Sequence, residues 1–336
     1  MVEKRARVAV DAMGGDYGPP EMVKGALEAA RSGDVEVILV GAEDAIRREL
    51  GGQDLSKLPL HVANATEVVA EHEPPVAGLR RKPDASILVA TRLVKEGRAD
   101  GLVSMGSTGA VMVSAVTVLG NLEGIKRPTL GDRLLGFTPD TILFDGGTNT
   151  DCRPRDLMSF ALIGSVVARK MLNIDNPTVG LISTGVEEGK GNLAVKGAYQ
   201  LLKESDLNFI GNAEGSDIPV GKANVLILDG FTGNVLLKFC EAFSDRIGDW
   251  LRETLDGRLP AEEIDAIRTK LFRQTHTADV NGGGMIYGVD GIVWVGHGRA
   301  KAAQVAQAIG QVRLAAETGL LRELKLELAK LRGVGE

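Results

Sequence analysis

Short runs of β-branched and other apolar residues alternate with helix-length segments along almost the whole chain. Such repeated β-α-β order predicts a mainly parallel sheet with helices on both of its faces. In open α/β sheets, ligands bind at the carboxyl ends of the strands. The strand candidates are 7–10, 35–40, 58–63, 99–104, 141–144, 178–182, 207–211, 223–228 and 291–296.

Five glycine-rich clusters follow predicted strands, at 11–16, 104–109, 145–151, 183–192 and 229–234. Each combines glycines with carboxylate, hydroxyl or amide side chains, so that backbone amides can approach an anion closely. Tight turns use the same residue types for geometry alone, but five clusters at corresponding positions favour a shared anion-binding or acyl-carrier cleft. The candidate binding residues in these clusters are Asp11, Gly14, Gly15, Asp16, Ser107, Thr108, Gly109, Asp145, Asn149, Asp151, Glu188, Gly191 and Asn234.

The cluster at 183–192 imitates two nucleotide-binding motifs without matching either fully. Gly185 to Lys190 is one residue shorter than a P-loop and lacks the hydroxyl that holds magnesium. Residues 189–194 fit the G-x-G-x-x-[GA] fingerprint, but the next predicted strand ends in Gly211 instead of the carboxylate that would hold the ribose. A nicotinamide-dependent dehydrogenase is therefore a weak alternative.

One segment, 235–274, contains no strand candidate and reads as two helices separated by "DGRLP". We expect a helical hairpin that projects from the sheet. Its second helix carries apolar residues at helical spacing with basic residues close by, which suits packing on the core or on a second subunit, or a tip that touches a membrane or a partner. The apolar residues are Ile264, Ile267, Leu271 and Phe272.

Composition excludes several classes of protein. A net charge of −6 and 4% aromatic residues argue against nucleic-acid binding. Two cysteines are too few for a disulfide framework or a zinc site, as expected in a reducing compartment, and no histidine cluster has metal-ligand spacing. Asp11 interrupts the first apolar stretch before a signal peptide could form. We expect a cytoplasmic protein without a resident metal.

Eight motifs occur in the order found in the bacterial phosphate acyltransferase family of phospholipid synthesis, which the chain resembles from Val8 to about His297. The resemblance implies transfer of a fatty acyl group from acyl carrier protein to inorganic phosphate, without a cofactor. It implies that a membrane glycerol-phosphate acyltransferase uses the acyl phosphate. The motifs are "AVDAMGGDYGPP", "LRRKPDAS", "ADGLVSMGSTGAVM", "IKRPTL", "DGGTNTDCRP", "GVEEGKGN", "NFIGNAEGSDIP" and "DGFTGNVLLK".

The same resemblance implies a three-layer α/β/α fold similar to isopropylmalate dehydrogenase and phosphate acetyltransferase. It also implies a homodimer and loose, peripheral membrane association through a helical tip. We predict one catalytic domain over 1–336, with the hairpin at 235–274 inside it.

Phosphate can attack a thioester without a covalent enzyme intermediate, because a thiol is an acceptable leaving group. The enzyme must place the anion and stabilise an oxyanion. We expect Lys190 to neutralise phosphate and Asn192 to donate a hydrogen bond to phosphate or to the oxyanion. Glu187 and Glu188 would hold the lysine or a partner, although Glu188 and Lys190 would equally form a solvated pair. Asp229, which also suits a helix cap, and His297 complete the catalytic candidates.

Three alternatives stay open. Arg80 and Lys82 would bind phosphate or acidic carrier protein, or would be solvent-exposed charges without a binding role. Cys152 would carry the acyl group in a covalent mechanism. The whole chain would act as a coenzyme A-dependent phosphate acetyltransferase, or as a scaffold that binds carrier protein without catalysis.

Overall fold

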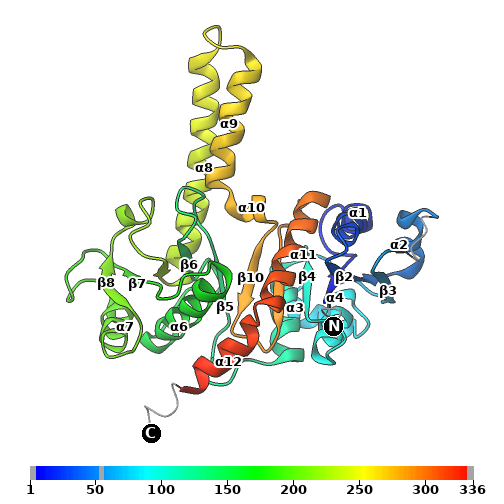
Figure 1. The fold of residues 1–336 in the computed structure, drawn as a ribbon, viewed down its shortest axis with the longest axis horizontal. Helices are drawn as coiled ribbons and strands as arrows, with labels where there is room; N and C mark the ends of the chain where they lie inside the picture. Colours follow the sequence, from blue (N-terminus) through cyan, green and yellow to red (C-terminus); the bar gives the residue numbers. More distant parts are fainter. Residues whose placement is uncertain (1–4, 53–56, 331–336) are drawn as a thin grey trace. The chain divides into compact units, whose positions relative to one another are not determined.

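The computed structural model describes residues 5–52 and 57–330 (Figure 1). The chain divides into two compact units: the first contains the residues up to Pro128 together with those from Asn281 onward, and the second spans Thr129–Val280. Both units are mostly parallel α/β structures, so the predicted fold class is confirmed. The assignment of 1–336 to one catalytic domain stays a prediction.

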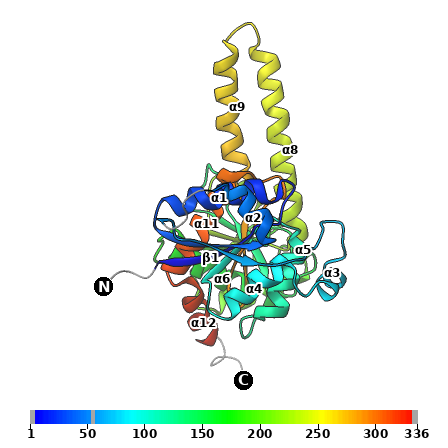
Figure 2. The ribbon, with the colours of Figure 1, turned by 90° about the vertical axis from the view of Figure 1, so that its right-hand side faces the viewer.

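In the first unit the strand order is β3-β2-β1-β4-β11-β10, and only β10 runs antiparallel to its neighbour β11. Helices α1 and α11 lie over one face of these strands and α4 over the other (Figure 2). The strands are β1 (Ala6–Asp11), β2 (Val35–Gly41), β3 (Leu60–Asn64), β4 (Gly101–Ser104), β10 (Gly284–Tyr287) and β11 (Ile292–Val295). The helices are α1 (Gly18–Arg31), α2 (Glu43–Leu50), α3 (Pro75–Arg81), α4 (Ser86–Lys95), α5 (Thr108–Ser114) with a π-helical turn η2 (Ala115–Leu119), α11 (Ala302–Glu317) and α12 (Leu320–Lys330).

In the second unit the order is β5-β6-β9-β7-β8, with β5 antiparallel to β6. Helix α6 packs on β6, β9 and α7. The strands are β5 (Thr129–Asp132), β6 (Ile142–Phe144), β7 (Val179–Ile182), β8 (Phe209–Ala213) and β9 (Val225–Ile227). The helices are α6 (Pro154–Met171), α7 (Leu193–Lys203), the 3-10 turn η3 (Gly215–Asp217), α8 (Gly230–Leu255), α9 (Ala261–Thr275) and α10 (Thr277–Asn281).

All nine strand candidates form strands, and each of the two strands that the sequence pattern missed, β5 and β10, runs antiparallel to a predicted neighbour. Each is only four residues long and contains glycine. Gly131 of β5 is needed because the Phe144 ring lies against it: a Cβ at Gly131 would sit 2.2 Å from a ring carbon. A short strand with glycine has too little β-branched content to be recognised by composition.

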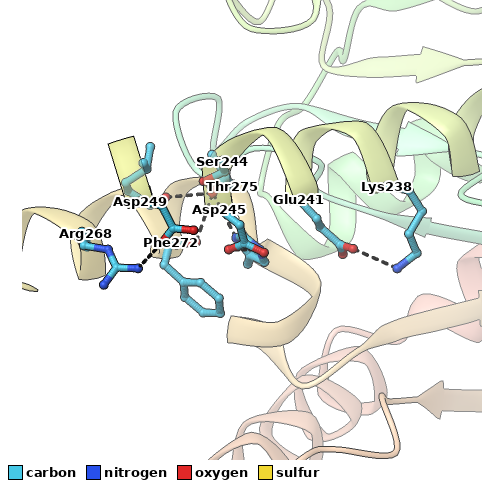
Figure 3. A network of polar contacts seen from close by, with 10 residues as sticks. Lys238, Glu241, Ser244, Asp245, Asp249, Arg268, Phe272 and Thr275 are labelled. Carbon is cyan, nitrogen blue, oxygen red and sulfur yellow. Dashed lines mark hydrogen bonds and ion pairs between the residues drawn. The ribbon is translucent and has the colours of Figure 1, made fainter. Parts of the chain in front are cut away.

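Helices α8 and α9 lie side by side and project from the strands of their unit (Figures 1 and 2). Polar contacts join the two helices (Figure 3). Ser244 and Thr275 share a hydrogen bond of 2.6 Å, and the guanidinium of Arg268 reaches the Asp249 carboxylate at 2.9 Å. Gly248 is buried where Arg268 crosses α8. The helices of the predicted hairpin are therefore confirmed, and polar contacts contribute to their packing beside the buried Ile264.

Several large apolar side chains of α8 are exposed. Five of them are more than half exposed and recur at i, i+4, i+8, i+12 and i+19, which places them on one face of the helix. We call this set the α8 stripe: Phe231, Val235, Phe239, Phe243 and Trp250.

The close approach of α1 to α11 gives a test of packing in the first unit. A Cβ at Gly25 would lie 2.5 Å from the carbonyl oxygen of Ala302 and 2.6 Å from Cβ of Val305. We expect Gly25→Ala to lower the free energy of unfolding by about 1–3 kcal/mol, because the helices must separate. The matched control is Gly310→Ala on α11, where a Cβ meets nothing within 4 Å; it should raise stability by about 0.5–1 kcal/mol. Denaturant unfolding of both variants followed by circular dichroism measures this, and equal effects would contradict the packing.

Candidate active site

In the second unit, strands β6, β9 and β7 are parallel neighbours in register, so the loops that follow them emerge at one edge. Phe144 is opposite Ile227, and Ile227 is opposite Leu181. The clusters at 145–151, 183–192 and 229–234 follow these residues directly. The structure therefore places three of the five predicted clusters at one edge of this unit, as their strand-end positions predicted.

Asp145 organises the first of these loops. Its fully buried carboxylate accepts hydrogen bonds from the backbone amides of Gly147 (2.9 Å), Thr148 (2.9 Å) and Asn149 (3.0 Å), and from Asn149 Nδ2 (2.6 Å). Four donors compensate a buried negative charge well. Asp145 and Asn149 therefore shape the loop from inside, and the outer residues of the loop are the ones available to a ligand.

The start of α8 packs directly on this loop. The Gly230 amide donates to the carbonyl of Asn149 at 2.7 Å, and a Cβ at Gly233 would lie 1.8 Å from the Asp145 carbonyl oxygen. Asn234 lies beside Gly147. The structure thus brings the predicted residues Asn149 and Asn234 into one cluster, and only glycine fits at two positions of the contact.

Asp229 is the N-cap of α8. Its carboxylate accepts hydrogen bonds from the Thr232 amide (2.8 Å) and the Thr232 hydroxyl (3.0 Å). A capping carboxylate satisfies a free helix amide and interacts favourably with the helix dipole. The expectation that Asp229 caps this helix is confirmed.

The loop between β7 and α7 carries the lysine that the sequence singled out. The Lys190 side chain is exposed and makes no ion pair with the residues that the structure describes. Asn192 is the N-cap of α7: its Oδ1 accepts from the Val195 amide at 2.9 Å, and its Nδ2 stays available. An ammonium group three residues before a helix N-terminus, with Gly191 between them at φ +95°, is a favourable place for an anion.

Glu188 does not hold Lys190. Its carboxylate turns to α7, where it pairs with Lys203 (3.0 Å) and accepts from Gln200 (2.7 Å), and these hydrogen bonds lower the pKa of Glu188. Of the two expected roles for Glu188, holding Lys190 or holding a partner, the structure shows the second, with Lys203 as the partner. The side chain of Glu187 lies nearer to Lys190, because both side chains border Gly185. A Cβ at Gly185 would be 2.9 Å from Glu187 Oε2 and 3.0 Å from Lys190 Cγ.

Two buried side chains that the sequence did not single out support the predicted loops. Asn212, on β8, donates its Nδ2 to the carbonyl of Glu187 at 2.8 Å and so ties the Lys190 loop to the sheet. In the first unit, Ser104 donates to Asp11 at 2.8 Å and accepts from the Gly106 amide at 3.1 Å. Ser104 begins the 104–109 cluster, which gave a positional signal, whereas Asn212 lies on β8, whose end carries none of the five clusters.

In the first unit, Asp11 links three segments. β1, β4 and β11 are parallel neighbours, and the buried Asp11 carboxylate bonds Ser104 at the end of β4, Ser86 at the start of α4 and the amide of Met13. Burial raises the pKa of Asp11, and the hydrogen bonds oppose this shift. Asp11 therefore positions the surrounding loops, as Asp145 does in the second unit.

Glycines let those loops touch. A Cβ at Gly14 would lie 2.8 Å from the Gly106 amide nitrogen, and a Cβ at Gly15 would lie 3.1 Å from the Gly298 carbonyl oxygen, which accepts from the Asp16 amide. His297 is half-buried in the same loop as Gly298. The clusters at 11–16 and 104–109 and the strand end with His297 thus come together within this unit.

The basic residues at the end of α3 differ in whether they form an ion pair. Lys82 pairs with Glu73 and donates to the carbonyl of Val68 at 2.6 Å, and its bond to Glu73 lowers the pKa of that carboxyl group. Arg80 is exposed and makes no ion pair among the described residues. Gly109 of the 104–109 cluster packs against Pro75, so α3 lies beside Thr108 and its cluster. Arg80 is the cation that remains available to a ligand.

Cys152 is poorly suited to be a nucleophile. Its half-buried thiol donates to the carbonyl of Asn149 at 3.5 Å. Burial, and then the charges of Asp145, Asp156 and Asp229, raise the pKa of Cys152 to about 12. The thiolate is the nucleophilic form, so this site keeps Cys152 in its unreactive form near neutral pH.

Residues 5–52 and 57–330 were also searched for metal-ligand groups and for membrane-spanning helices. Within these ranges, no three His, Cys, Asp or Glu side chains are grouped to hold a metal ion. None of the helices there has the length and apolar composition that crossing a bilayer requires.

The raised pKa predicts slow alkylation of Cys152. At pH 7 a thiol with a pKa of about 12 is ionised roughly a thousand-fold less than a free thiol with a pKa near 8.5. In a Cys240→Ala variant, iodoacetamide should therefore modify Cys152 about a thousand-fold more slowly than it modifies glutathione, and the rate should still rise with pH at pH 10. Mass spectrometry follows the reaction, and a rate that levels off below pH 9 would show an activated thiolate.

The family model described as "Fatty acid synthesis protein" matches residues 6–322. The phosphate acyltransferase of Desulforamulus reducens is 39% identical over 334 residues, covering 98% of this chain and 99% of that protein. The phosphate acyltransferase of Heliobacterium modesticaldum is 43% identical over 312 residues, covering 91% and 93%. Among solved structures, a phosphotransacetylase from Streptococcus pyogenes has a similar fold, with a TM-score of 0.60, 16% identity and 94% of each chain covered. The chain belongs to the phosphate acyltransferase family of fatty acid and phospholipid synthesis.

Proposed function

We propose that this acyltransferase moves a fatty acyl group from acyl carrier protein to inorganic phosphate by direct attack of phosphate on the thioester. The observation that carries the proposal is the unpaired Lys190 ammonium beside the N-terminus of α7, at the strand edge that also bears the Asp145 loop. Membership of the phosphate acyltransferase family supports phosphate as the acceptor. The carrier-protein donor is the part that needs a direct test.

The chemistry asks mainly for placement. Phosphate is already a nucleophile, and the departing thiol needs little activation. The Lys190 ammonium and the free amides in the first turn of α7 attract the phosphate dianion, and Asn192 Nδ2 donates to phosphate or to the oxyanion. Cys152 supports direct attack, because its raised pKa disfavours an acyl-cysteine intermediate.

The first unit supplies a second group of proposed substrate contacts. Ser107, Thr108, Asp16 and His297 lie on the loops that Asp11 and the glycines hold together. Hydroxyl, carboxylate and imidazole groups at the ends of parallel strands suit hydrogen bonding to a polar substrate. We assign them to substrate binding, with Asp11, Gly14, Gly15 and Gly109 shaping the loops.

A coenzyme A-dependent phosphate acetyltransferase is the second candidate, because the fold resembles that of a phosphotransacetylase. At 16% identity this likeness concerns the fold alone. The two candidates differ in the acyl donor, so donor preference separates them. A scaffold without catalytic activity would release no acyl phosphate from either donor.

We also propose that the hairpin makes contacts outside the chain. The α8 stripe is apolar and exposed, whereas α8 and α9 are joined by polar contacts. Such an exposed stripe marks an interaction surface, and we assign it to a second copy of the chain in a homodimer. On α9, Ile267 and Phe272 are also exposed and are assigned to loose contact with the cytoplasmic membrane surface, close to a membrane glycerol-phosphate acyltransferase. Ile264 is 4% exposed and Leu271 is half-buried, so both stabilise the hairpin instead.

Lys190→Ala tests the assigned site. With palmitoyl acyl carrier protein and phosphate, the wild type should release free carrier thiol and hydroxylamine-trapped acyl phosphate in equal amounts. The variant should lose about 10- to 100-fold in kcat/KM for phosphate, because a charge that stabilises the bound anion is gone. The control is Lys196→Ala, which removes an exposed lysine of α7 one turn further along.

Either of two results would revise the proposal. Unchanged kinetics in Lys190→Ala would remove the lysine from the site. Product with acetyl coenzyme A but none with long-chain acyl carrier protein would favour the second candidate.

The α8 stripe predicts a dissociable dimer. Phe239→Ser combined with Phe243→Ser removes two stacked rings from the stripe. We expect the wild type to be a dimer at micromolar concentration and the variant to be monomeric, because the apolar contact is lost. Light scattering after gel filtration measures the mass, and Glu263→Ser on α9 is the control. An unchanged mass in the Phe239→Ser, Phe243→Ser variant would refute the dimer contact.

The proposed membrane contact of α9 is tested separately. Ile267→Ser combined with Phe272→Ser should reduce co-sedimentation of the protein with anionic vesicles. Unchanged co-sedimentation would refute the membrane contact.

A further inference from the structure

The first unit contains a cavity at the opposite end of its strands from the glycine clusters. The cavity holds about 620 Å³ and lies at the amino ends of β1, β4 and β11, where Ala6, Asp100 and Ile292 contribute to its wall. The ends of α4 and α11 and the first turns of α12 complete the wall. None of the residues assigned above to substrate binding lines it. Its volume is within the usual range of about 300–1,000 Å³ for small-molecule sites.

Two of the three carboxylates in the wall are paired with neighbouring cations. Asp100 accepts two hydrogen bonds from the Arg7 guanidinium, at 3.0 and 3.2 Å. Asp290 pairs with Lys325 at 2.5 Å. Glu317 lies 3.8 Å from Arg313 Nε, but Arg313 also pairs with Asp34 at 3.0 Å, so Glu317 is the carboxylate of the wall that keeps most of its negative charge.

Three further cations of the wall lack a counter-charge. Arg5 and Arg322 form no ion pair among the residues that the structure describes. Lys95 donates to the carbonyl of Leu119 at 3.0 Å, which leaves its positive charge uncompensated. The cavity thus carries excess positive charge, and two of the three groups are guanidinium forks that match phosphate geometry.

The remainder of the wall is apolar. Ala99, Ile292 and Ala315 are at most 5% exposed and form a floor of small and branched side chains. Val94 and Leu321, both half-buried, extend this surface toward the rim. An apolar floor beneath a cationic rim suits a ligand with an anionic head and an aliphatic part.

We propose that this cavity binds a phosphate monoester that carries an aliphatic chain, with its head on Arg5, Lys95 and Arg322 and its chain on the apolar floor. Three uncompensated cations match a phosphate dianion better than a single carboxylate charge. The site is separate from the Lys190 loop and does not depend on the reaction proposed above. It would bind a phosphorylated lipid or its precursor without acting on it chemically.

Binding of octyl phosphate by isothermal titration calorimetry tests the site. The full-length Lys190→Ala variant serves as the parent, so that the proposed active site contributes little. We expect one site in the parent, a loss of at least about tenfold in affinity after adding Arg322→Glu, and a change of less than about twofold after adding Lys330→Glu. Lys330 lies on α12 but outside the cavity wall, so its substitution controls for the change in charge.

Further ligands and one filling variant define the ligand class. Inorganic phosphate and octanoate should each bind at least about tenfold more weakly than octyl phosphate, because each lacks one of the two features. Ala316→Trp places a large ring in the cavity wall and should abolish binding while circular dichroism stays native. Equal binding by the Arg322→Glu variant and its parent, or equal binding of inorganic phosphate and octyl phosphate, would overturn the proposal.

Discussion

Parallel register of neighbouring strands is the constraint on which the candidate site depends. In the second unit, Phe144, Ile227 and Leu181 are aligned across three strands, so three loops must begin at the same edge. In the first unit, Asp11 and Ser104 are aligned in the same way. Loops from distant parts of the sequence therefore become neighbours, and contacts such as the hydrogen bond from Gly230 to Asn149 then join them.

Within this arrangement, each unit uses one buried aspartate to organise its loops. Asp145 gathers four donors from a single loop, whereas Asp11 joins the ends of β1 and β4 to the start of α4. A buried carboxylate is stable only when donors surround it, and here those donors belong to the loops themselves. These two carboxylates are used internally, whereas the exposed Lys190 and Arg80 make no ion pair among the described residues.

The hairpin combines polar contacts between its two helices with an exposed apolar stripe. Hydrogen bonds and ion pairs such as Ser244 with Thr275 and Arg268 with Asp249 lie between the helices, while the α8 stripe faces outward. Interior polar contacts contribute modest net stability, so burial of the stripe against another surface would add much to the stability of the hairpin. This imbalance is the structural argument for a contact beyond the single chain.

The sequence alone predicts the alternation of strands and helices, the hairpin segment and the positions of the glycine clusters, because these depend on local periodicity and turn chemistry. It also singled out Lys190 and the capping role of Asp229, which follow from residue type and from position at a strand end. The partner of each side chain depends on the tertiary structure. Of the alternatives left open, Glu188 pairs with Lys203 and Ile264 is buried, and β5 and β10 form strands because neighbouring strands supply their hydrogen bonds. Such choices depend on groups far apart in sequence or one helical turn away, and a local pattern does not record which of several possible partners lies within reach.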